Sequence, residues 1–401
     1  MTITPLWTRS FCLLTLSHLL GALGYASMLL LPLYLAFLGG SRTEIGMVMA
    51  SANIAGLLTR PFVGWSLDRF GRRYSLILGG VLTALSLVGV YFINSVDITA
   101  FSVRILFGIG EGFIFTGYFA FAADLIPPHR RTEGLALFGV AGLLPLLVNP
   151  IADITGFQGG DLRVFLSGVS ILVLLSALLV LLIPKQEGRR AGDRSNNEKS
   201  ESERLATDKS SKTTNTVQYL LASRLRPLWW STIAFAGAVS LMMTFASVIG
   251  STRGITYPTS VWFTYVAGAV FARLFGAKLP EKIGPARLVA PSLALYGFAL
   301  LIYALFPQVS AMLISGLLAG IAHGYCFPVL TSLVVSAVSE SYRGRALAMF
   351  TGTWGGAAVL IAPLAGKIAD SLGDEQMLFI FAGLLFFATL YAKPSRFQQS
   401  L

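Results

Sequence analysis

Long uninterrupted apolar stretches recur along the whole chain, and they constrain its fold more than any other feature. Many contain 18 or more residues with hardly a charge, and as a helix each is long enough to cross a hydrocarbon core of about 30 Å. Only 12% of the 401 residues are charged, and 55% are hydrophobic, whereas a soluble domain carries about 25% charged residues. The sequence therefore predicts an integral membrane protein whose chain crosses the bilayer many times.

These stretches are continuously apolar and do not alternate with polar residues, which favours helices over the strands of a barrel. The first stretch exceeds the apolar region of a signal peptide, about 7–15 residues, so we expect it to be a true span. The sequence predicts twelve membrane-spanning helices, near residues 10–37, 44–66, 74–94, 98–124, 132–155, 161–184, 228–252, 257–279, 286–306, 309–338, 343–369 and 374–393.

Lysine and arginine are distributed unevenly between the two sides of this predicted bundle. One side holds most of them, and the other holds only Arg42, Arg163, Arg253 and Lys367. Loops rich in these residues stay in the cytoplasm, so both termini are predicted to be cytoplasmic, as in a bacterial-type inner membrane protein. The net charge of +11 then reflects topology and contact with membrane lipid, and we expect no nucleic acid partner.

A polar segment of low complexity, residues 185–216, divides the predicted helices six and six. It has too few apolar residues to fold alone, so we expect a mobile cytoplasmic linker across 185–227. The linker would join an N-terminal six-helix bundle, residues 1–184, to a C-terminal six-helix bundle, residues 228–401.

The two halves also repeat each other. Three residues of the first half have counterparts 213 residues later: Arg60 and Arg273, Asp68 and Glu281, Gly71 and Gly284. "RTEGLALF" from residue 131 matches "RGRALAMF" from residue 343. Such a duplication implies a pseudo-two-fold axis along the membrane normal, with a shared site near the midplane. The expected fold class is an all-α polytopic membrane protein with two pseudo-symmetric six-helix bundles.

Two motifs carry a resemblance to a known family. "GWSLDRFGRR", between the second and third predicted helices, resembles the signature loop of the major facilitator superfamily, and "RILFGIGEG" resembles a second motif associated with its proton-coupled antiporters. The resemblance implies a secondary transporter that works by alternating access, as a monomer and without a cofactor. The glycine-proline antiporter signature of the fifth helix is not reproduced in "GVAGLLPLLVNP", which weakens the assignment to drug antiporters.

The signature loop also predicts a cytoplasmic gate. Asp68 can accept charge-assisted hydrogen bonds from arginine and from helix amides, and such bonds can exchange when they are partly wet. We expect Gly64 to allow a close helix approach and Gly71 a tight reversal. Simple anchoring by basic residues is the alternative, but it leaves Asp68 and the glycines unexplained. The predicted gate residues are Arg60, Gly64, Asp68, Arg69, Gly71, Arg72, Asp124, Arg273, Glu281 and Gly284.

Arg104 and Glu111 are predicted to lie inside the fourth helix, where charged residues are costly and by default functional. Seven residues apart, they share one helix face at a separation of about 10 Å. Desolvation disfavours an ionised carboxylate, so Glu111 can take a proton from one side and release it to the other. A static pair with Arg104 is the alternative. His18 and His323 complete the predicted proton-coupling set, with simple packing as their alternative.

The predicted substrate contacts are mostly aromatic, and packing is the alternative for each: Tyr25, Phe115, Tyr118, His323 and Phe327. Two acids near the outer helix ends, Asp153 and Asp370, are expected to contact water. A soft-metal site from His323, Cys326, Met242 and Met243 is a weaker hypothesis, because methionine also fills packing gaps, and no metal site is predicted.

No nucleophile elbow, phosphate-binding loop or zinc-ligand spacing occurs in the sequence, so we expect neither an enzyme nor an ATP-driven pump. The leading hypothesis is proton-coupled export of a drug or metabolite, with Glu111 as the proton carrier. Uptake or facilitated diffusion of a polar metabolite such as a sugar is one alternative. A non-transporting receptor or scaffold, which binds a partner through the linker, is the other.

Overall fold

The computed structural model describes residues 6–127, 130, 134, 138–184, 225–276, 279–339, 342–392 and 394. Within these residues the chain forms helices joined by short turns, and no strand occurs among them. Most of the predicted linker, 185–227, and most of the "RTEGLALF" repeat lie outside the described residues.

The first half contains six helical segments in chain order. The first is bipartite, because a 3-10 turn joins α1 to α2. The fifth combines a 3-10 turn, η4, with α7 and belongs to the shorter apolar helix Phe138–Ile154. The bounds are α1 (Arg9–Ser27), α2 (Leu31–Phe37), α3 (Arg42–Arg69), α4 (Arg72–Gly89), α5 (Ile98–Leu125), η4 (Leu144–Leu147), α7 (Val148–Ile154) and α8 (Leu162–Leu181).

The second half repeats this order, with one short additional helix, α13, in the turn that corresponds to the signature loop. A 3-10 turn, η7 (Pro258–Ser260), precedes its second long helix. The bounds are α11 (Arg226–Thr252), α12 (Val261–Leu274), α13 (Leu279–Ile283), α14 (Ala286–Leu305), α15 (Val309–Ser336), α16 (Arg343–Leu372) and α17 (Asp374–Tyr391).

Each of the twelve predicted spans overlaps a helical segment. Nine candidate spans in the described residues are long and apolar enough to cross a membrane. The other three overlaps fall on α3, on the segment 138–154 and on α12. α12 has only 14 residues, and the 28 residues of α3 include charged residues at both ends, so length and composition alone do not select them.

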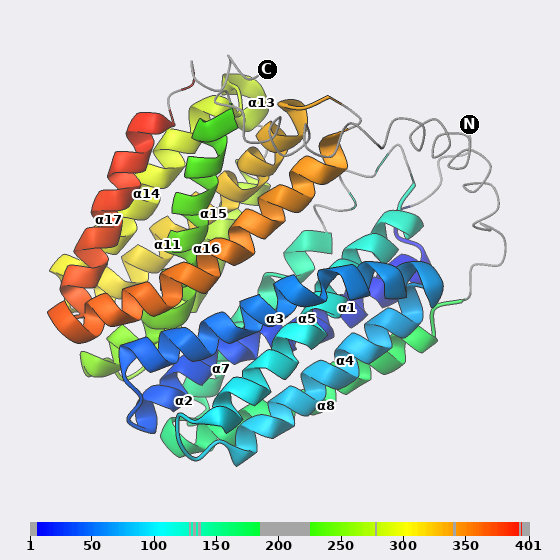
Figure 1. Cartoon of the computed structure of the whole chain (residues 1–401), viewed down its shortest axis with the longest axis horizontal. Helices are drawn as coiled ribbons and strands as arrows, with labels where there is room; N and C mark the ends of the chain where they lie inside the picture. Colours follow the sequence, from blue (N-terminus) through cyan, green and yellow to red (C-terminus); the bar gives the residue numbers. More distant parts are fainter. Residues whose placement is uncertain are drawn as a thin grey trace.

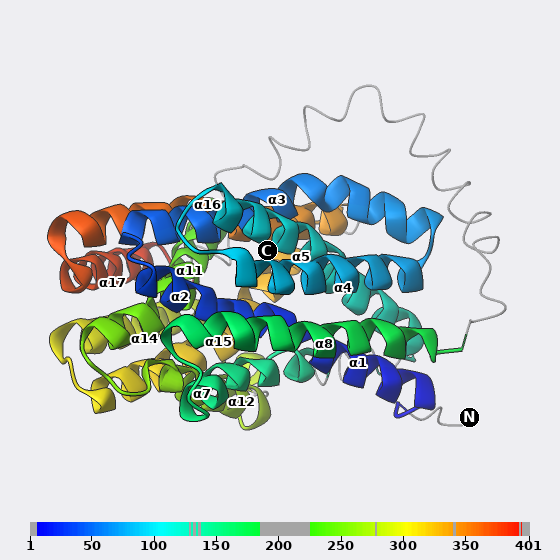
Figure 2. The ribbon, with the colours of Figure 1, turned by 90° about the horizontal axis from the view of Figure 1, so that it is seen from below.

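The helices form two bundles that diverge from a common region of contact (Figure 1). Between the bundles α3 packs on α16, and η4 and α7 pack on α12 and η7; α7 and α12 lie next to each other in Figure 2. We call the end that contains residues 184 and 225 the linker end, and the end that contains the turns 38–41, 253–260 and 373 the far end.

The far end is held together by polar contacts between the halves. The backbone amides of Arg42 and Thr43 each donate to Asp370 at 2.8 Å, and the Arg42 guanidinium pairs with Asp374 at 2.7 Å. A Cβ at Gly366 would collide with the backbone of Arg42, so the helices approach closely here because of the glycine.

A second contact closes the far end between α7 and η7. Asp153 is only 4% exposed and accepts hydrogen bonds from the hydroxyl of Thr259 at 2.6 Å and from its amide at 3.0 Å. The expectation that Asp153 contacts water is therefore wrong, because the second half covers it. Asp370 is exposed but is also bound to the other half. The structure thus has the halves joined at the far end.

Candidate functional site

The signature loop forms the tight turn that its glycines predict. Gly71 has a φ of +83° and directly precedes α4, and its counterpart Gly284 has a φ of +88° before α14. Only glycine adopts such a backbone without strain. Both turns therefore confirm that the repeat preserves a backbone reversal, and not only a pattern of letters.

The ionic contacts of the loop stay inside the first half. Arg72 donates to Asp124 at 3.2 Å and lies 3.9 Å from Asp68. The Asp68 side chain is 86% exposed, and in this conformation it forms no ion pair with the described residues of the second half. Its predicted role as a gate stays a prediction, to be tested in the conformation that closes the linker end.

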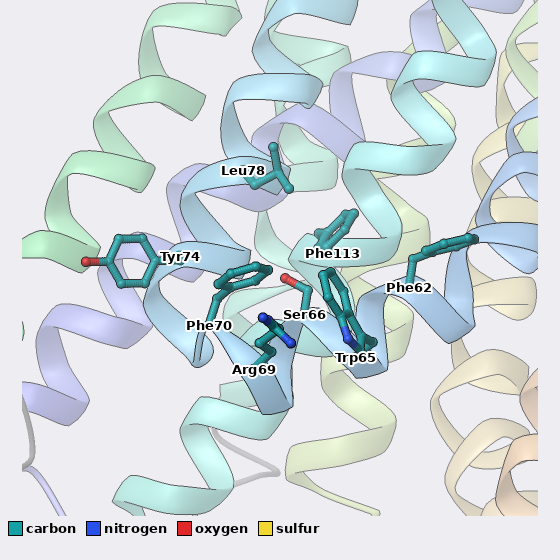
Figure 3. Close-up of a pocket in the computed structure, with 8 residues that line it drawn as sticks. All are labelled: Phe62, Trp65, Ser66, Arg69, Phe70, Tyr74, Leu78 and Phe113. Carbon is teal, nitrogen blue, oxygen red and sulfur yellow. The ribbon is translucent and has the colours of Figure 1, made fainter.

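Gly64 does not serve the purpose expected of it in this structure. A Cβ added there would meet nothing within 4 Å, so the expected close helix approach is absent. Arg69 instead lies beside Trp65 and Phe70, with its guanidinium carbon 5.7 and 6.0 Å from their ring centres. These residues form part of a pocket of about 690 Å³ between α3, α4 and α5 (Figure 3), lined by Phe62, Trp65, Ser66, Arg69, Phe70, Tyr74, Leu78 and Phe113.

Two of the predicted gate residues reach the opposite half, and both are arginines. Arg60 of α3 donates to the hydroxyl of Thr351 at 3.1 Å and to its carbonyl at 3.0 Å. Arg273 of α12 extends toward Gly139 of the first half. Glu281 lies on α13 and forms no ion pair with any residue that the structure describes.

Three polar side chains form a central cluster in the first half. Tyr25 of α1 interacts electrostatically with Arg104 and Glu111 of α5, and the two charged residues interact with each other. Glu111 stands fourteen residues into the 28-residue α5. Its Oε2 atom and two guanidinium nitrogens of Arg104 are buried without a hydrogen-bond partner in the described part of the chain. Electrostatic attraction at a distance, without a direct ion pair, agrees with the separation expected from the sequence.

Two aromatic residues predicted as substrate contacts are exposed in this structure, and their role stays a prediction. Phe115 lies one turn from Glu111 on α5 and is 54% exposed, and Tyr25 is 38% exposed. Tyr118 and His18 are buried instead. The Tyr118 hydroxyl is bonded to Ser17, and the His18 ring stacks on Phe138 with centroids 4.3 Å apart. The geometry of these two favours packing, and their predicted roles stay predictions.

His323 and Phe327 lie in an aromatic cluster of the second half. The His323 Nδ1 atom is hydrogen-bonded to the hydroxyl of Tyr265 on α12. The rings of Phe235 and Trp354 approach His323, at 5.5 and 6.2 Å between centroids, and Phe327 lies 5.3 Å from Trp354.

The sequence predictions missed Phe235, Tyr265 and Trp354, because a single aromatic residue in an apolar helix looks like ordinary packing. The one sequence signal is the spacing of His323 and Phe327, which lie one turn apart on α15. It indicates that one face of α15 carries a polar and an aromatic side chain together.

Comparison with known proteins identifies the family. The sequence profile of the Major Facilitator Superfamily matches residues 13–285 and 260–398 of this chain. This chain belongs to the major facilitator superfamily. It is therefore an integral membrane transporter and not an enzyme, and both the family and the fold class predicted from the sequence are confirmed.

Relatives extend over most of the chain. It is 26% identical to an uncharacterized MFS-type transporter of Salmonella typhimurium over 88% of both chains. It is 22% identical to the staphylopine export protein of Staphylococcus aureus over 87% of this chain and 86% of that one. Among solved structures, the nucleoside transporter NupG has a TM-score of 0.74 at 15% identity, covering 96% of this chain and 99% of that chain, and this likeness concerns the fold alone.

Proposed function

We propose that this transporter exports a small molecule in exchange for protons, and that Glu111 carries the proton. The observation that supports this most strongly is the position of Glu111. Among the described acidic residues it alone lies more than one helical turn from a helix end. An acid so deep in a span is costly and marks a functional site.

The neighbours of Glu111 suit a group that changes charge. Arg104 stabilises the ionised carboxylate electrostatically, while burial favours the neutral acid. The two opposing effects leave both protonation states accessible. Tyr25 on α1 interacts electrostatically with both charges and is partly exposed. A change in the charge of Glu111 on α5 would therefore also act on α1.

Alternating access then requires the far end to open and the linker end to close. The polar contacts that hold the far end, Arg42 with Asp374 and Asp153 with Thr259, would break in that step. The excess of Lys and Arg at the linker end supports a cytoplasmic position for it and for both termini. The similarity to the staphylopine export protein over 87% of the chain supports export as the direction.

The test is a substrate screen in sealed proteoliposomes with an imposed pH gradient, comparing the wild type with Glu111→Gln. The variant should lose substrate movement driven by the pH gradient, while exchange of labelled for unlabelled substrate without a gradient persists. Glu375→Gln, which changes an exposed carboxylate at the far end, is the matched control. Unchanged gradient-driven transport in Glu111→Gln would refute the assignment of the proton to this residue.

A further inference from the structure

Arg60 and Arg273 are equivalent residues of the internal repeat, and they reach equivalent places in the opposite halves. Arg60 Nη1 lies 3.9 Å from the position that a Cβ would take at Gly352, and Arg273 Nη1 lies 3.9 Å from the same position at Gly139. The two glycines, like the two arginines, are separated by the repeat offset of 213 residues. The halves therefore exchange one arginine each across their interface.

Among the described residues, only Arg60 of these two arginines has a hydrogen-bond partner. Arg60 donates to the side chain and the carbonyl of Thr351. The position that matches Thr351 is Phe138 at the offset of 213 residues and Gly139 at the offset of the "RTEGLALF" match. Neither residue offers a hydroxyl, and the buried ring of Phe138 stacks on His18. No hydrogen bond or ion pair joins the Arg273 guanidinium to any residue that the structure describes.

Among the residues that the structure describes, the second half also has no acid that forms an ion pair with Arg273. The acidic residues among its described positions are four, all at helix ends or in the turn before α14: Glu281, Asp370, Asp374 and Glu375. In the first half, by contrast, Arg104 has Glu111 as an electrostatic partner. Arg273 lies in the last turn of α12 and is half-buried. A half-buried charge without an acidic partner among the described residues is costly, so we expect Arg273 to be retained for binding.

The surroundings of Arg273 combine polar groups with apolar faces. Its charge acts on Tyr265 and on His323, which are hydrogen-bonded to each other. Phe235 and Trp354 pack around His323 with their rings 5.3 Å apart. A guanidinium offers a planar fork of donors that suits carboxylate and phosphate oxygens, and aromatic side chains are typical walls of small-molecule sites.

We propose that Arg273 binds the anionic group of the transported molecule, and that this molecule is an oxyanion, a carboxylate or a phosphate, with an apolar or aromatic body. The anion lies between α12 and the segment around Gly139, and its apolar body lies against the aromatic cluster of His323, Phe235 and Trp354. The inference rests on the proposed transport function, but it does not require coupling to protons.

The test measures binding to the purified full-length protein in lipid nanodiscs by isothermal titration calorimetry. The probes share one ring and differ in charge: benzoate, phenyl phosphate, neutral benzamide and the benzylammonium cation. The wild type should bind one or both oxyanions at least about tenfold more tightly than benzamide, since a charge-assisted fork is lost in the neutral probe. Arg273→Gln should remove this preference and leave the affinity for benzamide within about twofold of the wild type.

Two further variants keep the result interpretable. Arg163→Gln removes one positive charge at the far end, where Arg163 lies over Tyr91, and should bind benzoate as the wild type does. Arg273→Lys keeps the charge but loses the planar fork, so its preference for oxyanions should be intermediate. If Arg273→Gln does not fold, Arg273→Lys alone decides, and an undiminished preference in it overturns the proposal.

Equal or tighter binding of benzamide or benzylammonium by the wild type overturns the proposal, as does an unchanged oxyanion preference in Arg273→Gln. The transport function is judged separately by the vesicle screen. A neutral or cationic molecule that moves under the pH gradient would leave proton-coupled transport standing while refuting the anion site.

Discussion

The two interfaces between the halves are related by the internal repeat, yet they have different chemistry. Where α3 meets α16, the helices touch through glycines at the far end and are hydrogen-bonded again at Arg60 and Thr351. Where the segment around α7 meets α12, polar contacts occur at the far end, but Arg273 further along has no hydrogen-bond or ion-pair partner in the part of the chain that the structure describes. The difference indicates that the duplication produced two related interfaces that both hold the far end, and that at the linker end only the first is joined by an arginine hydrogen bond among the described residues.

The largest effect is expected from a larger side chain at a glycine contact of the first interface, between α3 and α16. A Cβ at Gly46 would collide with the carbonyl of Ala362, and overpacking of this kind costs about 1–3 kcal/mol. Gly46→Val should therefore prevent closure of the far end and lower transport at least about tenfold. Gly383→Val, at a position with nothing within 4 Å, is the control for membrane insertion. Transport by Gly46→Val at the wild-type rate would show that the close glycine contact between α3 and α16 is not needed for transport.

The far-end contact of the second interface should produce the next largest effect. Asp153→Ala leaves the buried amide of Thr259 without its acceptor, which costs about 1–3 kcal/mol, while the Thr259 hydroxyl keeps the Asn149 carbonyl as a second acceptor at 3.1 Å. Hydrogen exchange should accelerate in the turn 253–260, because the far end opens more often. Asp153→Asn keeps an acceptor oxygen and should be milder. Equal exchange rates in the wild type and Asp153→Ala would contradict the contact.

The ion pair of the first interface should contribute less. Arg42 and Asp374 are partly accessible, with 14% and 19% of their side chains exposed, so solvent screens their attraction and we expect a coupling energy of about 1 kcal/mol. A double-mutant cycle with Arg42→Gln and Asp374→Asn, read from hydrogen exchange in the turn 38–41, measures this energy. A coupling energy near zero would mean that the glycine contacts, and not this ion pair, stabilise the first interface.

The smallest effect on the transport rate is expected from removing the side-chain partner of Arg60. Thr351→Val removes the hydroxyl that accepts from Arg60 but leaves the carbonyl, which also accepts. One hydrogen bond of a pair is worth about 1 kcal/mol, so the transport rate should change no more than about fivefold. A complete loss of transport would mean that Arg60, and not Arg273, is the arginine with a direct role in binding.

Much of the fold could be predicted from the sequence, because bilayer thickness and backbone hydrogen bonding leave few choices. The helix positions, the repeat and the glycine turns at Gly71 and Gly284 all follow from local patterns. The depth of Glu111 also follows, since it depends only on its place along one helix. The burial of Asp153 was missed because it depends on Thr259 in the other half, which no local pattern reports.

The same reason explains the errors and omissions at the site. Gly64 looks like a contact residue in the sequence, but whether a helix lies against it depends on the conformation of the carrier. Arg273 was grouped with the gate because it matches Arg60, and only the structure shows that Arg60 bonds to Thr351 while Arg273 extends toward Gly139. Trp354 and Tyr265 were missed because aromatic clusters assemble from helices far apart in the chain.

The central claim is that one carboxylate couples the movement of substrate to that of protons. Proteoliposomes with a trapped pH indicator and an outward substrate gradient test it most directly, in the wild type and in Glu111→Gln. We predict that substrate movement changes the internal pH only in the wild type, while both proteins exchange labelled substrate. Proton movement of equal size in Glu111→Gln would contradict the account.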